Sequence, residues 1–179
     1  MRLFFAIELP SDVRDALGRL RPKDESRDYR WVDPALMHVT LAFLGEQPAE
    51  QLAVLQTIGA AAANASQRGL LQLGTAGSFG SRRAPRVLWV DLVGDVEGLL
   101  SLQHRLDAAL QQAGFAVSEQ SFRAHVTLAR RREGARGGPP QLSAPPHATF
   151  TMAKLTLMQS RLSPRGPTYT AVSEFPIGG

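Results

Sequence analysis

The chain contains no cysteine and no long apolar run among its 179 residues. The first absence excludes disulfide bonds, thiolate zinc sites and catalysis by a cysteine nucleophile, and it suits a reducing compartment. The second is equally informative, since a membrane-spanning helix needs roughly 20 apolar residues. The apolar start of the chain is broken by Glu8 and Pro10 and lacks the small-residue exit of a signal peptide. We therefore expect a cytoplasmic protein that does not enter a membrane.

Lysine is scarce, because only Lys23 and Lys154 are lysines among twenty basic residues. Neither stands in a nucleotidylation motif, which disfavours a ligase that forms a covalent nucleotidyl-lysine. The other eighteen are arginines, whose planar guanidinium suits phosphate oxygens. Residues 1–80 carry a net charge of −1 and residues 81–179 a net charge of +5. We expect an acidic or phosphate-bearing partner, although a GC-rich genome would explain the arginine count equally well.

The apolar pattern predicts the same order of elements twice, strand, helix and strand. The first half is predicted to begin with a strand at 2–9 and a helix that has Ser11 as its N-cap. The segment 31–45 is predicted to end in a strand, followed by a helix at 48–65 and a strand near 70–76. The second half is predicted to hold a strand at 86–92, a helix at 95–114, a strand at 121–130 and closing strands at 148–160 and 168–176. Loops are predicted at 21–30, 77–86 and 131–147.

The string HVTLA occurs at 38–42 and again at 125–129, at matching places in the two halves. The repeat period of about 87 residues is too long, and the copies too few, for a solenoid. We expect an α+β fold with two lobes related by a pseudo-twofold axis, antiparallel sheets lining a central cleft and helices outside. The chain would form one two-lobed domain over 1–179, with halves near 1–80 and 81–147 and closing strands at 148–176.

Each copy of the motif combines one polar face with one apolar face. In a strand, residues two apart point to the same side, so His38 emerges with Thr40 and His125 with Thr127. An imidazole has an ordinary pKa of about 6.5, so one of two can be neutral while the other is protonated. One could then remove a proton from a nucleophile and the other protonate a leaving group, while the threonine hydroxyls bind a phosphate. This pattern predicts acid–base chemistry on a phosphodiester without a metal or a cofactor.

Two other interpretations of the histidines stay open. A single histidine in a strand is more often a core residue with its hydrogen bonds satisfied, but an identical pentapeptide at matching places makes that reading weaker. Two histidines could also ligate zinc, although a zinc site usually needs a third protein ligand and none belongs to the pattern. His104 lies off the leucine stripe of its helix and is expected in solvent, and His147 lies in a loop.

At these residues the chain resembles the two-histidine (2H) phosphoesterase superfamily, and within it the RNA 2′,3′-cyclic phosphodiesterases, also called 2′-5′ RNA ligases. The matching segments are RLFFAIELP, RWVDPALMHVTLAFLGE, GSFGSRRAPRVLWVDL, FRAHVTLARR and LMQSRLSPRGPTYTAVSEFP. The resemblance implies hydrolysis of an RNA 2′,3′-cyclic phosphate to a 2′-phosphomonoester. It implies His38 as proton donor to the 3′ oxygen, His125 as the base that activates water, and Thr40, Thr127 and Arg130 as phosphate contacts.

Arg130 raises a geometric question. By strand parity it shares the face of Val126 and Leu128, so it reaches the cleft only if the strand ends or bulges near Ala129. Otherwise it is a solvated arginine. Aromatic rings could stack on the terminal base, with Tyr169 as the open candidate. Phe122 is a further candidate, while Phe43 and Trp89 are expected in the core. The 131–147 loop is predicted to form a lid that contacts RNA.

The sequence leaves four functions open. The first is the cyclic phosphodiesterase acting on RNA ends, tRNA fragments among them, as a monomer. The second is 2′-5′ ligation, in which a 5′-hydroxyl replaces water. The third is an RNA-binding adaptor that retains the pocket without catalysis. The fourth is a phosphodiesterase for small cyclic or 2′-5′-linked nucleotides, which would need a tighter and less basic cleft.

Overall fold

The computed structural model describes residues 1–22, 27–118, 120–164 and 166–178. Part of the predicted 21–30 loop, at 23–26, lies outside these residues. Over the described ranges the chain forms two antiparallel sheets and three α-helices, which confirms the predicted α+β class. The elements are β1 (Arg2–Glu8), α1 (Ser11–Gly18), β2 (Tyr29–Trp31), the 3₁₀ turn η1 (Pro34–Leu36), β3 (His38–Glu46), η2 (Ala49–Gln51), α2 (Leu52–Asn64), β4 (Gly69–Gly80), β5 (Pro85–Gly94), α3 (Val96–Gln112), β6 (His125–Arg131), β7 (Thr149–Met152), β8 (Lys154–Ser163) and β9 (Gly166–Pro176).

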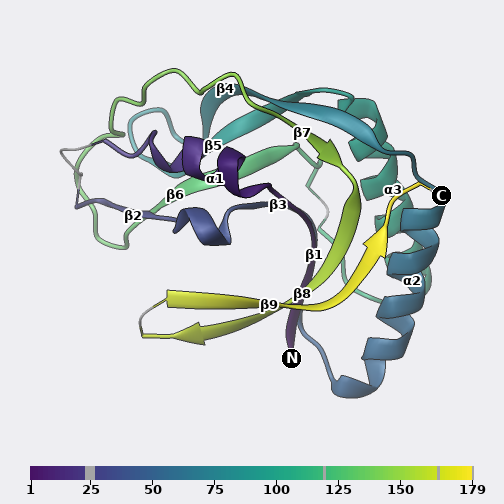
Figure 1. Cartoon of the computed structure of the whole chain (residues 1–179). Helices are drawn as coiled ribbons and strands as arrows, with labels where there is room; N and C mark the ends of the chain where they lie inside the picture. Colours follow the sequence, from purple (N-terminus) through teal and green to yellow (C-terminus); the bar gives the residue numbers. More distant parts are fainter. Residues whose placement is uncertain (23–26, 119, 165, 179) are drawn as a thin grey trace.

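The two sheets have the strand orders β3-β1-β8-β9 and β2-β6-β5-β4-β7. The pairs β1–β3 and β5–β6 occupy matching places, as the sequence repeat predicts. Each sheet also takes strands from the other part of the chain, since β4 pairs with β5 while β8 pairs with β1. Helix α2 packs on β8 and β9, α3 packs on β3 and β4, and the two helices lie side by side (Figure 1). Among the described helices none is long and apolar enough to cross a membrane.

Strand β1 is buried on both faces, which explains its nearly continuous apolar sequence. Leu3, Phe5 and Ile7 belong to the main core. Phe4 and Ala6 point the other way, into a small cluster with Met158 and Tyr169. The predicted leucine stripe of α3 is also confirmed, with every member fully buried: Leu99, Leu102, Leu106 and Leu110.

Both motif strands contain a one-residue register shift at the same place. In β3 the partners step from Phe5–Ala42 to Ala6–Thr40, so Leu41 has no partner of its own in β1. In β6 they step from Leu88–Ala129 to Trp89–Thr127, which leaves Leu128 as the extra residue. The leucine and the alanine that follows it are consequently both buried in each copy. The repeated pentapeptide therefore encodes a bulged strand, and the bulge reverses the parity of the residues beyond it.

The predicted loop at 77–86 is wrong for most of its length. Strand β4 runs to Gly80 and β5 begins at Pro85, so the connection is a short turn. A side chain at Gly77 would overlap the indole ring of Trp89 on the neighbouring strand. This glycine permits a close approach within the sheet and does not mark a loop.

Other details of the helices and strands also differ from the prediction. The expected strand at 148–160 is two strands, because Ala153 separates β7 in one sheet from β8 in the other. Ser11 is the first helical residue and not the N-cap, a position taken by Pro10 without a side-chain hydrogen bond. The short strand β2 was not predicted, because its three residues carry no periodic pattern, and it pairs with β6.

Two helical glycines give a matched test of the packing. A Cβ at Gly59 would lie 2.5 Å from Phe175 Cε2 and 2.9 Å from Phe5 Cε1, whereas at Gly98 it would meet only Met152 Cε at 3.9 Å. Gly59→Ala should therefore lower the free energy of unfolding by about 1–3 kcal/mol through overpacking. Gly98→Ala should raise it by about 0.5–1 kcal/mol through helix propensity. Urea denaturation measures both, and equal effects of the two variants would contradict the packing described here.

Candidate active site

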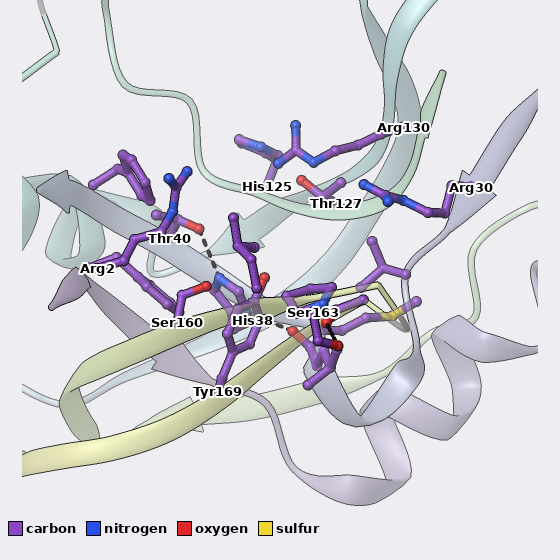
Figure 2. Close-up of a pocket in the computed structure, with 18 residues that line it drawn as sticks. Arg2, Arg30, His38, Thr40, His125, Thr127, Arg130, Ser160, Ser163 and Tyr169 are labelled. Atoms are coloured by element: carbon purple, nitrogen blue, oxygen red, sulfur yellow. Dashed lines mark hydrogen bonds between the residues drawn. The ribbon is translucent and has the colours of Figure 1, made fainter. Parts of the chain in front are cut away.

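The two motif strands meet at a cavity of about 620 Å³. All six predicted site residues line it, namely His38, Thr40, His125, Thr127, Arg130 and Tyr169. Figure 2 shows His125, Thr127 and Arg130 together on one side and His38 with Tyr169 on the other. The cavity thus brings together two imidazoles, two hydroxyls and a guanidinium from strands that are far apart in sequence.

Each imidazole is held by the backbone carbonyl two residues before it. Nδ1 of His38 lies 2.7 Å from the carbonyl oxygen of Leu36, and Nδ1 of His125 lies 2.7 Å from that of Arg123. A carbonyl oxygen only accepts, so Nδ1 carries the proton in both rings and Nε2 has the lone pair when the ring is neutral. In His38 this Nε2 lies 3.0 Å from Thr40 Oγ1 (Figure 2). Both rings are therefore fixed in the tautomer that offers Nε2 for proton transfer.

The carbonyl of Leu36 is positioned by the turn η1. Asp33 caps this turn by accepting a hydrogen bond from Ala35 N at 2.9 Å, and Pro34 occupies its first position. The chain then enters β3 directly at His38. The segment DPALMH thus acts as a local support for one histidine.

Aromatic rings flank both histidines. The ring of His38 lies 4.9 Å from Phe4 and 5.3 Å from Tyr169, the latter edge-on, between ring centroids. Phe79 approaches His125 edge-on at 5.0 Å, and Trp89 lies at 6.3 Å. These rings exclude water from the imidazoles, which disfavours their charged form.

The pKa of His38 is lowered from its ordinary value of 6.5, mainly because the ring is buried. The positive charges of Arg130 and His125 lower this pKa further. The hydrogen bond to Leu36 and the carboxylate of Glu8 act in the opposite direction. His38 is consequently neutral near pH 7 in the free protein.

Burial also lowers the pKa of His125, with Arg130 and Arg123 contributing in the same direction. The hydrogen bond to the backbone carbonyl of Arg123 opposes them. Arg130 thus acts on both histidines at once. A neutral His125 has the protonation state that a general base requires.

Arg130 reaches the cavity because of the bulge at Leu128. The register shift returns Arg130 to the side of Thr127. The strand therefore bulges near Ala129, which is the condition under which Arg130 was expected to reach the cleft. Its cross-strand partner is Arg30 of β2, and Arg30 lines the same cavity. Two guanidiniums side by side favour an anion between them. Arg30 was not identified from the sequence, because its place depends on a short edge strand without a periodic pattern.

The other sequence candidates fall in different places. Phe43 is 51% exposed and lines the cavity, so the expectation that it is a core residue is wrong. Trp89 is buried as predicted, and His104 is exposed as predicted. Phe122 lines a second cavity, whereas no described residue of the predicted lid beyond Arg131 lines either one.

Within the described ranges, no three histidine, aspartate or glutamate side chains gather as metal ligands. The groups that converge on the cavity are instead two nitrogen bases, hydroxyls and arginines. This set can bind a phosphate and exchange protons on two sides of it.

The chain is similar to a family of known proteins over most of its length. A family model described as the 2′-5′ RNA ligase superfamily matches residues 9–163. An RNA 2′,3′-cyclic phosphodiesterase of Thermus thermophilus is 33% identical over 186 residues, covering 100% of this chain and 91% of the relative. One from Escherichia coli is 33% identical over 144 residues, covering 78% of this chain and 77% of the relative.

Solved structures give the same match. The protein TT0787 of Thermus thermophilus superposes with a TM-score of 0.85 at 32% identity, covering 99% of this chain and 98% of that one. Escherichia coli LigT complexed with 3′-AMP superposes with a TM-score of 0.84 at 28% identity, covering 98% and 97%.

The electrostatic role of Arg130 can be tested by NMR titration of the two imidazoles. Both should titrate below 6.5 in the free protein, and Arg130→Gln should raise the pKa of both by removing one positive charge. Arg30→Gln is the matched comparison, since it removes the same charge from the neighbouring strand position and should shift both titrations less than Arg130→Gln does. If Arg130→Gln left the titrations in place, its charge would not be the one that acts on the pair.

Proposed function

The chain belongs to the 2′-5′ RNA ligase superfamily, and we propose that it hydrolyses the 2′,3′-cyclic phosphodiester ends of RNA to 2′-phosphomonoesters. The observation that carries this proposal is the matched fixation of the two imidazoles. Each donates Nδ1–H to a backbone carbonyl and keeps Nε2 for the cavity that both histidines line. The pair can then act on one phosphate as acid and base.

The proposed reaction is a single displacement at phosphorus. His125 Nε2 takes a proton from water, and the water oxygen forms a bond to phosphorus. The bond between phosphorus and O3′ breaks, and protonated His38 gives its Nε2 proton to O3′. The products are a 2′-phosphomonoester and a 3′-hydroxyl. Every proton and bond is accounted for without a metal ion or a covalent enzyme intermediate.

The phosphate would be bound by Thr40, Thr127 and Arg130. Thr40 Oγ1 already lies beside Nε2 of His38, so a phosphate oxygen that accepts from the hydroxyl would come within reach of the same imidazole. Arg130 supplies a charge-assisted hydrogen bond to the anion. Arg30, its cross-strand neighbour, adds a second positive charge on that side.

Substrate binding would supply the proton that His38 needs. The imidazole is neutral in the free protein because burial lowers its pKa, and the phosphate introduces a negative charge that favours the imidazolium. The same anion neutralises the charge of Arg130, which otherwise lowers this pKa. Binding and protonation are therefore coupled, with the acid formed only when a phosphate is present.

Tyr169 is the proposed base contact on the His38 side. Its ring is in T-shaped contact with His38 and Phe4 and lines the cavity, where it could stack on the terminal base. The cytoplasmic location, the monomeric state and tRNA fragments as substrates stay predictions from the sequence.

A second candidate function is 2′-5′ ligation, which the name of the matching family also includes. The same two imidazoles would serve it, with a 5′-hydroxyl in place of water. An RNA-binding adaptor would need the arginines but neither Nε2 atom. The alanine variants of the two histidines therefore separate an enzyme from an adaptor.

The proposed function predicts hydrolysis in excess EDTA of a short RNA that ends in a 2′,3′-cyclic phosphate. The product should carry a 2′-phosphate, identified by mass and by resistance of the end to a 3′-phosphatase. His38→Ala and His125→Ala should each lower kcat/KM by roughly 10²–10⁴-fold, the usual contribution of a positioned acid or base. His104→Ala is the control, because this histidine is exposed outside the cavity. Activity that EDTA abolishes would favour the metal alternative, and activity retained in both variants would exclude the paired-histidine mechanism.

The pH dependence provides an independent test. Both histidines have a pKa below 6.5 in the free protein, so the singly protonated pair is most abundant on the acid side of neutrality. The value of kcat/KM should peak there and fall as the pH rises above it. The kcat profile should lie at higher pH, because the bound phosphate raises the pKa of His38. A kcat/KM profile with its basic limb above neutrality would contradict the lowered pKa values.

A further inference from the structure

A second cavity of about 630 Å³ adjoins the candidate active site. It shares Thr40, Phe43, His125 and Arg130 with the first cavity, so the two cavities border each other at these residues. His38 lines the first cavity, while His125 lines both. The second cavity therefore lies on the His125 side of the candidate active site, where a nucleophile for the phosphate would approach.

The walls of the second cavity combine aromatic rings with positive charge. Three phenylalanines line it, Phe43, Phe79 and Phe122, and four arginines, Arg86, Arg123, Arg130 and Arg131. Asp107 also lines it and accepts a hydrogen bond from the buried Gln103. Among the described lining residues the arginines outnumber this carboxylate, so the described part of the wall is positive on balance. Aromatic faces stack on nucleobases and arginines bind the connecting phosphates, so this lining is typical of a site for single-stranded nucleic acid.

Two residues of the second cavity, Arg123 and Phe43, are positioned by side-chain contacts and still remain about half exposed. Arg123 stacks over Trp89 at 4.3 Å and pairs with Asp91 at 3.8 Å, while its side chain stays 55% exposed. Phe43 occupies the position in β3 that Arg130 occupies in β6, directly after the bulge. It forms the border between the two cavities, with its ring 51% exposed and Arg2 4.8 Å from the ring centroid.

We propose that the second cavity is the subsite for the 5′-hydroxyl nucleotide of a second RNA strand. This inference rests on the proposed function, in which the nucleophile approaches from His125. In the transfer step the 5′ oxygen forms a bond to phosphorus and gives its proton to His125 Nε2. The bond between phosphorus and O3′ breaks, and O3′ takes a proton from His38 Nε2. The product is a 2′-5′ phosphodiester with a free 3′-hydroxyl.

The subsite also sets the choice between hydrolysis and transfer. A nucleotide in the second cavity excludes water from the side of His125 and presents its own oxygen there. Occupation of this cavity should therefore lower the rate of hydrolysis by more than the amount of donor that is consumed in transfer. That effect separates a binding site for the acceptor from an accidental reaction with an alcohol in solution.

The test uses a short RNA with a 2′,3′-cyclic phosphate as donor and a 5′-hydroxyl trinucleotide as acceptor. Hydrolysis is measured first without acceptor and then at increasing acceptor concentration, and the 2′-5′ product is identified by its resistance to ribonucleases that cleave 3′-5′ linkages. The same trinucleotide with a 5′-phosphate is the control strand, since it has no 5′-hydroxyl to attack the cyclic phosphate.

Arg86→Gln is the informative variant, because Arg86 is exposed and lines the second cavity but not the first. It should raise the acceptor concentration for half-maximal transfer roughly tenfold, while hydrolysis without acceptor changes less than twofold. Arg82→Gln is the matched control, since this exposed arginine lies near Arg86 in sequence and lines neither cavity. Phe122→Leu is a second variant that should weaken acceptor use in the same way, and its thermal unfolding midpoint reports whether it folds.

Each outcome has a definite meaning. Inhibition of hydrolysis by the 5′-hydroxyl strand, joined product and a specific loss in Arg86→Gln would support the subsite. An acceptor that neither inhibits nor is joined, or equal behaviour of Arg86→Gln and Arg82→Gln, would overturn it and leave the proposed hydrolysis intact. A wild-type protein without hydrolysis in the absence of acceptor would reject the proposed function itself, and the subsite with it.

Discussion

A bulge in each motif strand determines which side chains reach the cleft. Without it, strict alternation would send Arg130 to the core side with Val126 and Leu128. The extra leucine allows two buried residues in succession, and the next residue returns to the polar side. This explains why the repeat extends beyond the histidine and threonine to the leucine and alanine. The last two residues of HVTLA preserve the geometry of the strand, and its histidine and threonine are the residues that line the cavity.

The same geometry fixes the state of the imidazoles. Each histidine begins its strand, so the carbonyl two residues earlier is free to accept Nδ1–H. The aromatic rings around each imidazole remove water and keep it neutral, and Arg130 adds to that effect. A phosphate reverses the balance by introducing negative charge. In the proposed mechanism, substrate recognition and formation of the acid are thus one electrostatic event, which would let a buried pair with lowered pKa values still exchange protons.

The periodic parts of the fold were predictable and the long-range pairings were not. Strands β1, β3, β5 and β6 and all three helices followed from apolar periodicity, and the family resemblance read from the motifs is confirmed. The sequence could not reveal that β8 joins β1 or that β2 covers β6, because such pairing depends on the whole chain. The repeat identified both histidines and both threonines. Two residues of the cavity were not identified from the sequence. Arg30 lies on a short edge strand without a periodic pattern, and Phe43 follows a bulge that changes which face it points to.

The residue after the bulge breaks the symmetry of the site. Identical motifs would give two interchangeable histidines, yet β6 continues with Arg130 and β3 continues with Phe43. The guanidinium therefore lies beside Thr127, while the exposed ring of Phe43 borders both cavities. The walls beyond differ as well, with Tyr169 and Arg30 in one cavity and Phe122 and Arg86 in the other. Direction must then come from these flanking residues, since the motifs themselves are the same. In the proposed mechanism, a duplicated acid–base pair can be kept identical because the strand beyond it determines which side receives the RNA end and which side delivers the nucleophile.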